Sequence, residues 1–204
     1  MGRKAATDPR ERLAEIGLDL DTIVDNILTV WKRATPSDIV AGERWYGNAG
    51  QLCSDLAAET PYSRETCAAA ISHLSPRTSW TRNVAGAVSL LHGGDAAGCL
   101  GENVKRARRA MASTTPLDTF GETAPKTTRF ARNILGDREQ VTVDVWAARI
   151  AFGPDFTGDA EATLDRKNVY AAVEHAYRLA AGRAGVDPTT MQATTWVVIR
   201  GKAD

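Results

Sequence analysis

The stretch KTTRFARNILGDREQVTVDVWAAR, residues 126–149, indicates the class of fold. Its first part has helical spacing, because apolar side chains recur on one face and arginines on the other. The Gly-Asp pair at 136–137 then ends this helix. A short apolar run at 141–143 leads to Asp144, which is placed as the N-cap of a second helix over residues 145–152. The pattern predicts a helix, a loop and a helix that carry an amine, a carboxylate and a guanidinium at fixed offsets.

Helical periodicity continues outward from this stretch in both directions. We expect residues 1–20 to form a flexible arm and residues 21–204 to form a single helical domain. The last segment is β-branched enough for a strand, but an Asp-Pro start favours a helix. The expected helices are 21–35, 37–57 with a possible break at Gly47, 63–75, 80–92, 102–111, 117–120, 126–135, 145–152, 164–181 and 187–199.

Composition is that of an ordinary soluble globular protein. Of 204 residues, 43% are hydrophobic and 25% charged, and no apolar run reaches the length of a membrane span. The polar N-terminus lacks the apolar core of a signal peptide, so we expect a cytoplasmic location. Three cysteines and three histidines are widely scattered, which predicts no metal site, no cofactor and no iron–sulfur cluster.

The zero net charge hides a basic middle segment. Residues 77–132 hold 9 Lys and Arg against 4 Asp and Glu. Such a patch suits a polyanion, although a solvated helix face has the same composition.

The opening stretch resembles the core motif of the helix-hairpin-helix DNA glycosylase superfamily, of the endonuclease III and MutY type. That motif runs roughly K-T-A, a loop, and then V-D-T-H-x-x-R. Lys126 and Asp144 lie 18 positions apart, as in endonuclease III, and Arg149 follows the Asp by five. Trp146 stands at the family's His position. The family's L-P-G-x-G hairpin reads FGETAP at residues 120–125, without the glycines that let backbone N–H groups approach a phosphate.

A second segment, LSPRTSW at residues 74–80, resembles the L-S-x-Q-T-S-W segment of the same superfamily. In that family the segment joins two helices and sends a side chain into the duplex beside an extruded base. Arg77 holds the inserting position here, with Trp80 behind it. A Ser-Pro loop followed by a capped helix gives the same sequence pattern.

Three further segments are similar to small proteins encoded by actinobacterial phages. They are NILTVW at 26–31, SPRTSWTRN at 75–83 and QATTWV at 192–197. This resemblance implies a diverged phage branch of the glycosylase fold, located in the host cytoplasm. Some phage branches of the superfamily are associated with thymine hypermodification.

The resemblance implies a compact all-α, helix-hairpin-helix DNA glycosylase-like bundle that acts on duplex DNA with a damaged or modified base. Asp144 would stabilise the electron-poor sugar as the base departs, and Lys126 would attack C1′ if burial or the neighbouring Arg129 favours the neutral amine. The expected DNA-binding residues are Arg77, Trp80, Lys105, Arg106, Arg108, Arg109, Arg129 and Arg132. The expected pocket residues are Ser75, Asn83, Trp146, Arg149, Gln192 and Trp196.

Alternatives remain open at each of these positions. Asp144 can be a helix cap, Lys126 a solvated first-turn lysine, and Arg149 the partner of a structural carboxylate. The function can be base excision, a transferase reaction in which an amine displaces phosphate or pyrophosphate on a 5-substituted pyrimidine of DNA, or non-catalytic binding of DNA or protein.

Overall fold

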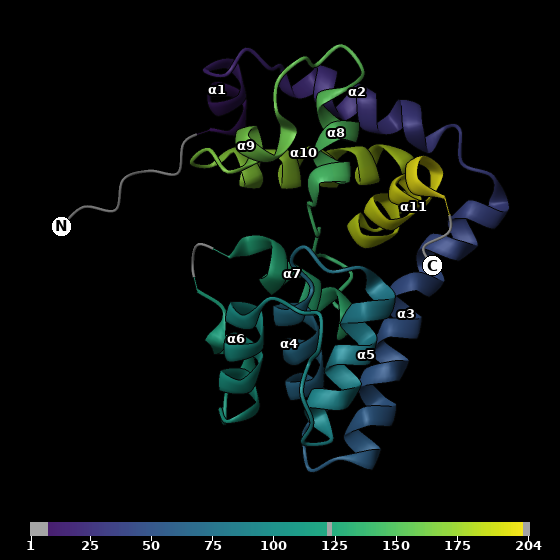
Figure 1. Ribbon diagram of the computed structural model, residues 1–204. Coiled ribbons are helices and arrows are strands. Elements are labelled where there is room, and N and C mark those ends of the chain that lie inside the picture. The colour runs from purple at the N-terminus through teal and green to yellow at the C-terminus, as the bar shows by residue number, and fades with distance from the viewer. Residues whose placement is uncertain (1–7, 122–123, 202–204) are drawn as a thin grey trace. The chain divides into compact units, whose positions relative to one another are not determined.

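The computed structural model describes residues 8–121 and 124–201, and these residues form α-helices and one short 3-10 helix (Figure 1). No strand occurs in the two described ranges, so the prediction of an all-α protein is confirmed. No helix within them is long and apolar enough to cross a membrane. The finer expectation of a glycosylase-like bundle stays a prediction.

Contacts divide the chain into two compact units. The first contains the described residues up to Gly42 together with Val141–Gly201, and the second is Glu43–Gln140. The chain leaves the first unit and returns to it about a hundred residues later, and the single domain expected for residues 21–204 stays a prediction. Each unit is described by itself below.

The first unit is built from helices at both ends of the sequence. Residues 36–42, the start of α3, also belong to it. Its other helices are α1 (Pro9–Ala14), α2 (Leu20–Trp31), α8 (Val145–Phe152), α9 (Ala160–Leu164), α10 (Val169–Ala184) and α11 (Pro188–Arg200).

Helix α1 lies within the range predicted to be a flexible arm. Its Leu13 is fully buried in the core of the first unit, and Asp8 caps the helix by accepting a hydrogen bond from the Arg10 N–H. A buried leucine stabilises a docked helix because its apolar surface leaves water. The prediction of a flexible arm is therefore corrected for residues 8–20, and residues 1–7 lie outside the described residues.

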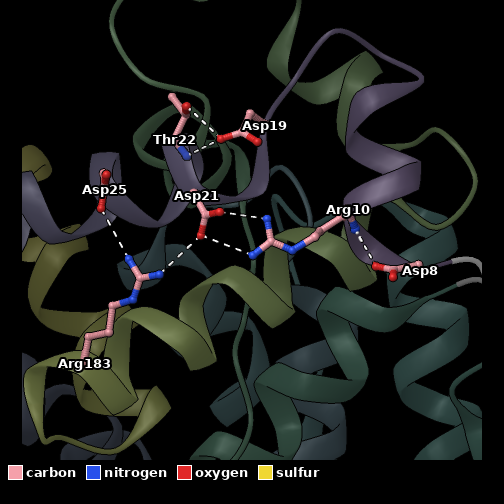
Figure 2. Close-up of polar contacts among 7 residues, drawn as sticks. All are labelled: Asp8, Arg10, Asp19, Asp21, Thr22, Asp25 and Arg183. Atoms are coloured by element: carbon pink, nitrogen blue, oxygen red, sulfur yellow. Dashed lines mark hydrogen bonds and ion pairs between the residues drawn. The ribbon is translucent and has the colours of Figure 1, made fainter.

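Charged side chains also join α1 to α2 and α2 to α10, as Figure 2 shows. Arg10 Nη1 lies 2.7 Å from Asp21 Oδ2, and Arg183 on α10 donates to Asp21 Oδ1 at 3.3 Å and to Asp25 Oδ1 at 3.4 Å. The hydrogen bond from Arg10 lowers the pKa of the Asp21 carboxyl. These groups are well exposed, so solvent screens them and the buried Leu13 matters more for docking.

A close contact fixes α2 against the end of α8. Asn26 donates from Nδ2 to the carbonyl of Ala151 at 3.0 Å. Gly153 ends α8 with a φ of +84°, and a Cβ atom there would lie 2.5 Å from that same Nδ2. Only glycine suits this position, because it must be left-handed and also have no side chain.

The second unit surrounds one buried helix. Its elements are the rest of α3 (Pro36–Glu59), α4 (Arg64–Leu74), α5 (Trp80–Leu91), α6 (Gly101–Met111), the 3-10 helix η1 (Pro116–Thr119) and α7 (Pro125–Ile134). Every residue of α4 from Thr66 to Leu74 is buried, and α4 contacts α5, α6, η1 and α7. Ser63 caps α4 by accepting a hydrogen bond from the Thr66 N–H at 3.1 Å.

Two polar side chains of α4 hold the elements around the predicted hairpin. Ser72 Oγ donates to the carbonyl of Thr127, in the first turn of α7, at 2.6 Å. His73 Nε2 lies 3.0 Å from Thr119 Oγ1, and its ring stacks on Phe120 with centroids 4.2 Å apart. Burial lowers the pKa of His73 to about 4, assisted by the nearby charges of Arg106 and Arg109. A neutral imidazole therefore suits this interior.

Several boundaries differ from the predicted ones. Helix α3 runs unbroken through Gly47, because a glycine in an exposed helix interior costs only about 1 kcal/mol and its buried neighbours hold the helix in place. Helix α2 begins at Leu20, one residue before the predicted start, and Asp19 caps it. The helix predicted at 164–181 begins later, at Val169, because Asn168 before it adopts a left-handed φ of +65°, and a separate short helix, α9, ends at Leu164. The final segment is helical, as favoured, with Asp187 as its cap.

Candidate functional site

Asp144 is the N-cap of α8, as the sequence predicts. Its backbone is extended, and Oδ1 accepts a hydrogen bond from the Ala147 N–H at 2.8 Å. Oδ2 accepts a second hydrogen bond from the indole Nε1 of Trp196 on α11 at 3.1 Å. The carboxylate is only partly buried. It is thus fixed by two neutral donors while part of it still faces solvent.

Two tyrosines of α10 hold the backbone on either side of Asp144. Tyr170 accepts from the Val143 N–H at 3.0 Å and donates to the Val141 carbonyl at 3.2 Å, which secures the extended segment before the cap. Tyr177 donates to the Ala147 carbonyl at 3.1 Å from a completely buried position. Burial raises the pKa of the Tyr177 phenol, so its hydrogen stays in place as a donor.

Cations and indole rings lie beside the carboxylate. The guanidinium carbon of Arg149 lies 4.7 Å from the ring centroid of Trp146, and that of Arg200 lies 4.9 Å from the same ring. Arg200 also lies 5.7 Å from the ring of Trp196. Both arginines are exposed. The first unit therefore combines a held carboxylate, two stacked guanidinium groups and two indoles.

The structure thus brings together four of the residues predicted for the site in the first unit, namely Asp144, Trp146, Arg149 and Trp196. Gln192, the fifth, is buried on α11 one turn before Trp196. Sequence reasoning missed Arg200, although its position four residues after Trp196 places both on one face of a helix. It also missed the two tyrosines, which carry no local signal because their partners are about thirty residues away.

Lys126 lies in the first turn of α7 in the second unit, and it is exposed. The burial that would favour its neutral amine is therefore not found, while Arg129 beside it is half-buried and Arg132 exposed. The preceding hairpin is described only in part, because Glu122 and Thr123 lie outside the described residues. Lys126 and Asp144 belong to different units, and their joint action stays a prediction.

The loop between α4 and α5 presents Arg77 in an unusual backbone conformation. Arg77 is exposed and has a φ of +58°, which costs a non-glycine residue on the order of 1 kcal/mol or more. Asn103 on α6 supports this loop by donating to the Pro76 carbonyl at 3.0 Å, and Ser75 donates to the carbonyl of Ser72 at 2.9 Å. These hydrogen bonds hold the loop in place, and Arg77 lies in it with a strained backbone.

Trp80, predicted to stand behind Arg77, belongs to an aromatic cluster. Its ring lies 5.1 Å from Trp45 and 6.4 Å from Phe130, and Tyr46 packs against the same two rings. The cluster is half-buried or buried throughout, which is typical of side chains that fill a core. Trp80 therefore supports the start of α5.

Asn83, one turn further along α5, is almost completely buried. Its Oδ1 atom has no hydrogen-bond partner among the described residues. Such a group costs free energy unless water or a ligand completes it.

The cations of α6 are exposed, but most of them have acidic neighbours. Lys105 and Arg106 lie 3.9 and 3.6 Å from the carboxylate of Glu102, and Arg108 lies 2.7 Å from Asp95. Arg109 adds a fourth exposed cation. This pattern is typical of a solvated helix face, and phosphate contact by α6 stays a prediction. Within the described ranges, no group of three or more His, Cys, Asp or Glu side chains is placed to hold a metal ion.

A family model described as DUF7178, a family of unknown function, matches residues 11–203. The chain belongs to this family. No curated protein and no solved structure matches it. The family's description assigns no activity to its members, so the functional argument rests on the geometry of the site.

Proposed function

We propose that the protein acts on DNA at the N-glycosidic bond of an extruded damaged or modified base, with Asp144 as the catalytic carboxylate. The observation that carries the proposal is the setting of that carboxylate. It is held by the Ala147 N–H and the Trp196 indole, and it stays partly exposed.

Departure of a base leaves positive charge on the sugar, so a carboxylate that keeps its own negative charge lowers the barrier. Asp144 makes no ion pair with Lys or Arg in the part of the chain that the structure describes, and both of its donors are neutral N–H groups. The two donors therefore fix the position of the carboxylate without neutralising its charge. A catalytic group needs this combination, because a fixed carboxylate stabilises the transition state without having to reorganise.

Two side chains of the second unit are proposed for the other two roles, and each is argued from its own unit. Arg77, exposed on its supported loop, is the side chain that enters the duplex where the base has left the stack. Lys126, exposed at the start of α7, is proposed as the nucleophile: in its neutral form the amine would bond to C1′ as the bond from C1′ to the base breaks, the base leaving with that electron pair and taking up a proton, and opening of the C1′–O4′ bond would then give a Schiff base with the opened sugar.

Asp144→Asn is the decisive variant, because asparagine also caps helices and the fold should survive. The purified protein is incubated with a panel of duplexes that carry damaged or phage-type modified bases, and abasic product is measured. We expect the substitution to lower the rate of base release by about 100-fold or more while DNA binding and the thermal midpoint stay close to wild type.

Asp159→Asn is the matched control. Asp159 caps α9 by accepting from the Glu161 and Ala162 N–H groups, so it has the same structural role without an indole donor. Base release should be unchanged in this variant. Full activity in Asp144→Asn would reject Asp144 as the catalytic group, and absence of abasic product from every duplex would reject base excision.

Borohydride trapping tests the amine separately. A covalent protein–DNA adduct that forms with wild type and is lost in Lys126→Gln identifies Lys126 as the nucleophile. A trapped adduct that persists in this variant assigns the chemistry to another amine. Mass spectrometry of nucleosides from the same reactions would reveal an altered base and so identify a transferase.

A further inference from the structure

Two exposed guanidinium groups lie over one indole ring of the first unit. The guanidinium carbons of Arg149 and Arg200 are 4.7 and 4.9 Å from the Trp146 centroid, and they come from different helices, α8 and α11. Two cations that share one ring lie within about 10 Å of each other, so they repel each other. The ring attracts both and holds them in place.

These two guanidinium groups have no acidic partner in the described part of the chain. Across residues 8–121 and 124–201, neither Arg149 nor Arg200 makes an ion pair. Asp144, the N-cap of α8, uses its oxygens to accept hydrogen bonds from the Ala147 N–H and the Trp196 indole instead. Arg183, also an exposed arginine of this unit, is by contrast paired with two aspartates. The Arg149 and Arg200 donors are thus arranged for a group that comes from outside the protein.

The chemistry of that group follows from the donors. A guanidinium stacked on a ring keeps its N–H groups at its edge, and two such forks match an anion with several oxygens at one centre. A phosphate has this geometry. Arg200 also lies beside the Trp196 indole that binds Asp144, so the phosphate would sit one side chain away from the carboxylate.

We propose that Arg149 and Arg200 form a phosphate clamp, with Trp146 as their positioning residue, for the DNA strand next to the nucleotide on which Asp144 acts. This inference rests on the proposed function, because it takes the phosphate to be that of a DNA strand. It adds a role for Arg149 beyond a general pocket position and introduces Arg200 to the site.

Binding of a labelled duplex of about 25 base pairs tests the clamp by fluorescence anisotropy over a range of salt concentrations. We expect Arg149→Gln and Arg200→Gln each to weaken binding about fivefold to tenfold and to reduce the salt slope by about one. Arg200→Lys should fall between wild type and Arg200→Gln, because lysine keeps the charge but loses the fork. Circular dichroism confirms that each variant is folded.

Arg166→Gln is the matched control, since it removes one exposed arginine from the connection between α9 and α10 of the same unit. It should change the affinity by less than about twofold. An equal loss in this control would overturn the clamp in favour of a general basic surface. Wild-type affinity in the double variant Arg149→Gln/Arg200→Gln would also overturn it.

Competition with a free deoxynucleoside monophosphate separates the two sources of a phosphate. Displacement of the duplex only at large excess, together with the arginine dependence above, supports the DNA strand. Tight nucleotide binding that needs both arginines, with unchanged duplex binding in the double variant, overturns it. Base release is measured in parallel. If binding depends on the arginines but no base is released, the clamp is supported and the proposed function is rejected. If base is released but binding does not depend on the arginines, only the clamp is rejected.

Discussion

The two units hold their candidate residues in different ways. In the first unit, side chains from two other helices act on the Asp144 segment directly, and Trp196 binds the carboxylate itself. In the second, the buried side chains of Ser72 and His73 hold elements beside Lys126, while Lys126 is exposed. The carboxylate of Asp144 is therefore positioned through its side chain, whereas Lys126 is positioned only through the backbone of its helix.

The largest expected effect comes from Leu13, which tests whether α1 is packed into the core of the first unit together with the helices up to α11. Leu13→Ala removes a fully buried side chain from that core. We expect the free energy of unfolding to fall by about 2 to 5 kcal/mol, because the cavity adds to the lost burial. Urea denaturation followed by circular dichroism measures the change.

Ala14→Ser is the control for this experiment, because Ala14 is the exposed neighbour of Leu13 on the same helix. It should shift the free energy of unfolding by less than about 0.5 kcal/mol. If Leu13→Ala behaves like Ala14→Ser, α1 does not contribute to the unit and the flexible arm is the better description.

What could be predicted from the sequence follows the same division between local and distant contacts. The helical class, the cap at Asp144 and the cap at Ser63 follow from spacing and from side chains that bond to backbone three residues away. Leu13 was missed because the six residues of α1 contain one leucine among mostly charged residues, which is too short a pattern to give a periodic signal. Of the two arginines that lie over the Trp146 ring, only Arg149 was predicted for the site. Arg149 is three residues from Trp146 in the sequence, whereas Arg200 is distant from it.

Contacts between site residues that are far apart in the sequence are the hardest to predict from the sequence. The indole of Trp196 reaches Asp144 across 52 positions, and no propensity or spacing encodes such a contact. The resemblance supplied both residues, but only packing of α11 against α8 brings them together. The exposure of Lys126 was likewise undetermined, because helical spacing does not distinguish a solvated first turn from a covered one.

The second unit is expected to be the one that loses stability in mild acid, through His73. Burial lowers the pKa of this imidazole from its ordinary 6.5 to about 4 in the folded protein. Between these two values the unfolded chain binds more protons, so the free energy of unfolding falls as the pH decreases from 6.5 to 4. The loss is at most about 3 kcal/mol, since each pKa unit corresponds to about 1.4 kcal/mol.

Urea denaturation of wild type and His73→Gln at several pH values between 7 and 4.5 isolates this contribution. Glutamine can still bond to Thr119 but does not titrate, so the variant should be less stable at pH 7 and lose less stability on acidification. Parallel curves for wild type and His73→Gln would show that His73 does not couple this unit to pH.

The smallest expected effect sharpens the claim that the Asp144 segment is held by side chains. Tyr177→Phe keeps the ring in its buried position and removes only the hydroxyl that donates to the Ala147 carbonyl. We expect a loss of about 1 kcal/mol in the free energy of unfolding, because one buried acceptor loses a partner while the packing is retained. Tyr62→Phe, at a half-buried tyrosine of the second unit, should lose less than half of this.

Because the Ala147 N–H binds Asp144, loosening this turn should also increase exchange of that amide with solvent. Faster exchange at Ala147 in Tyr177→Phe, with unchanged exchange in Tyr62→Phe, would tie the buried phenol to the position of the carboxylate, whereas identical exchange in both would leave the cap to the local helix start and to Trp196.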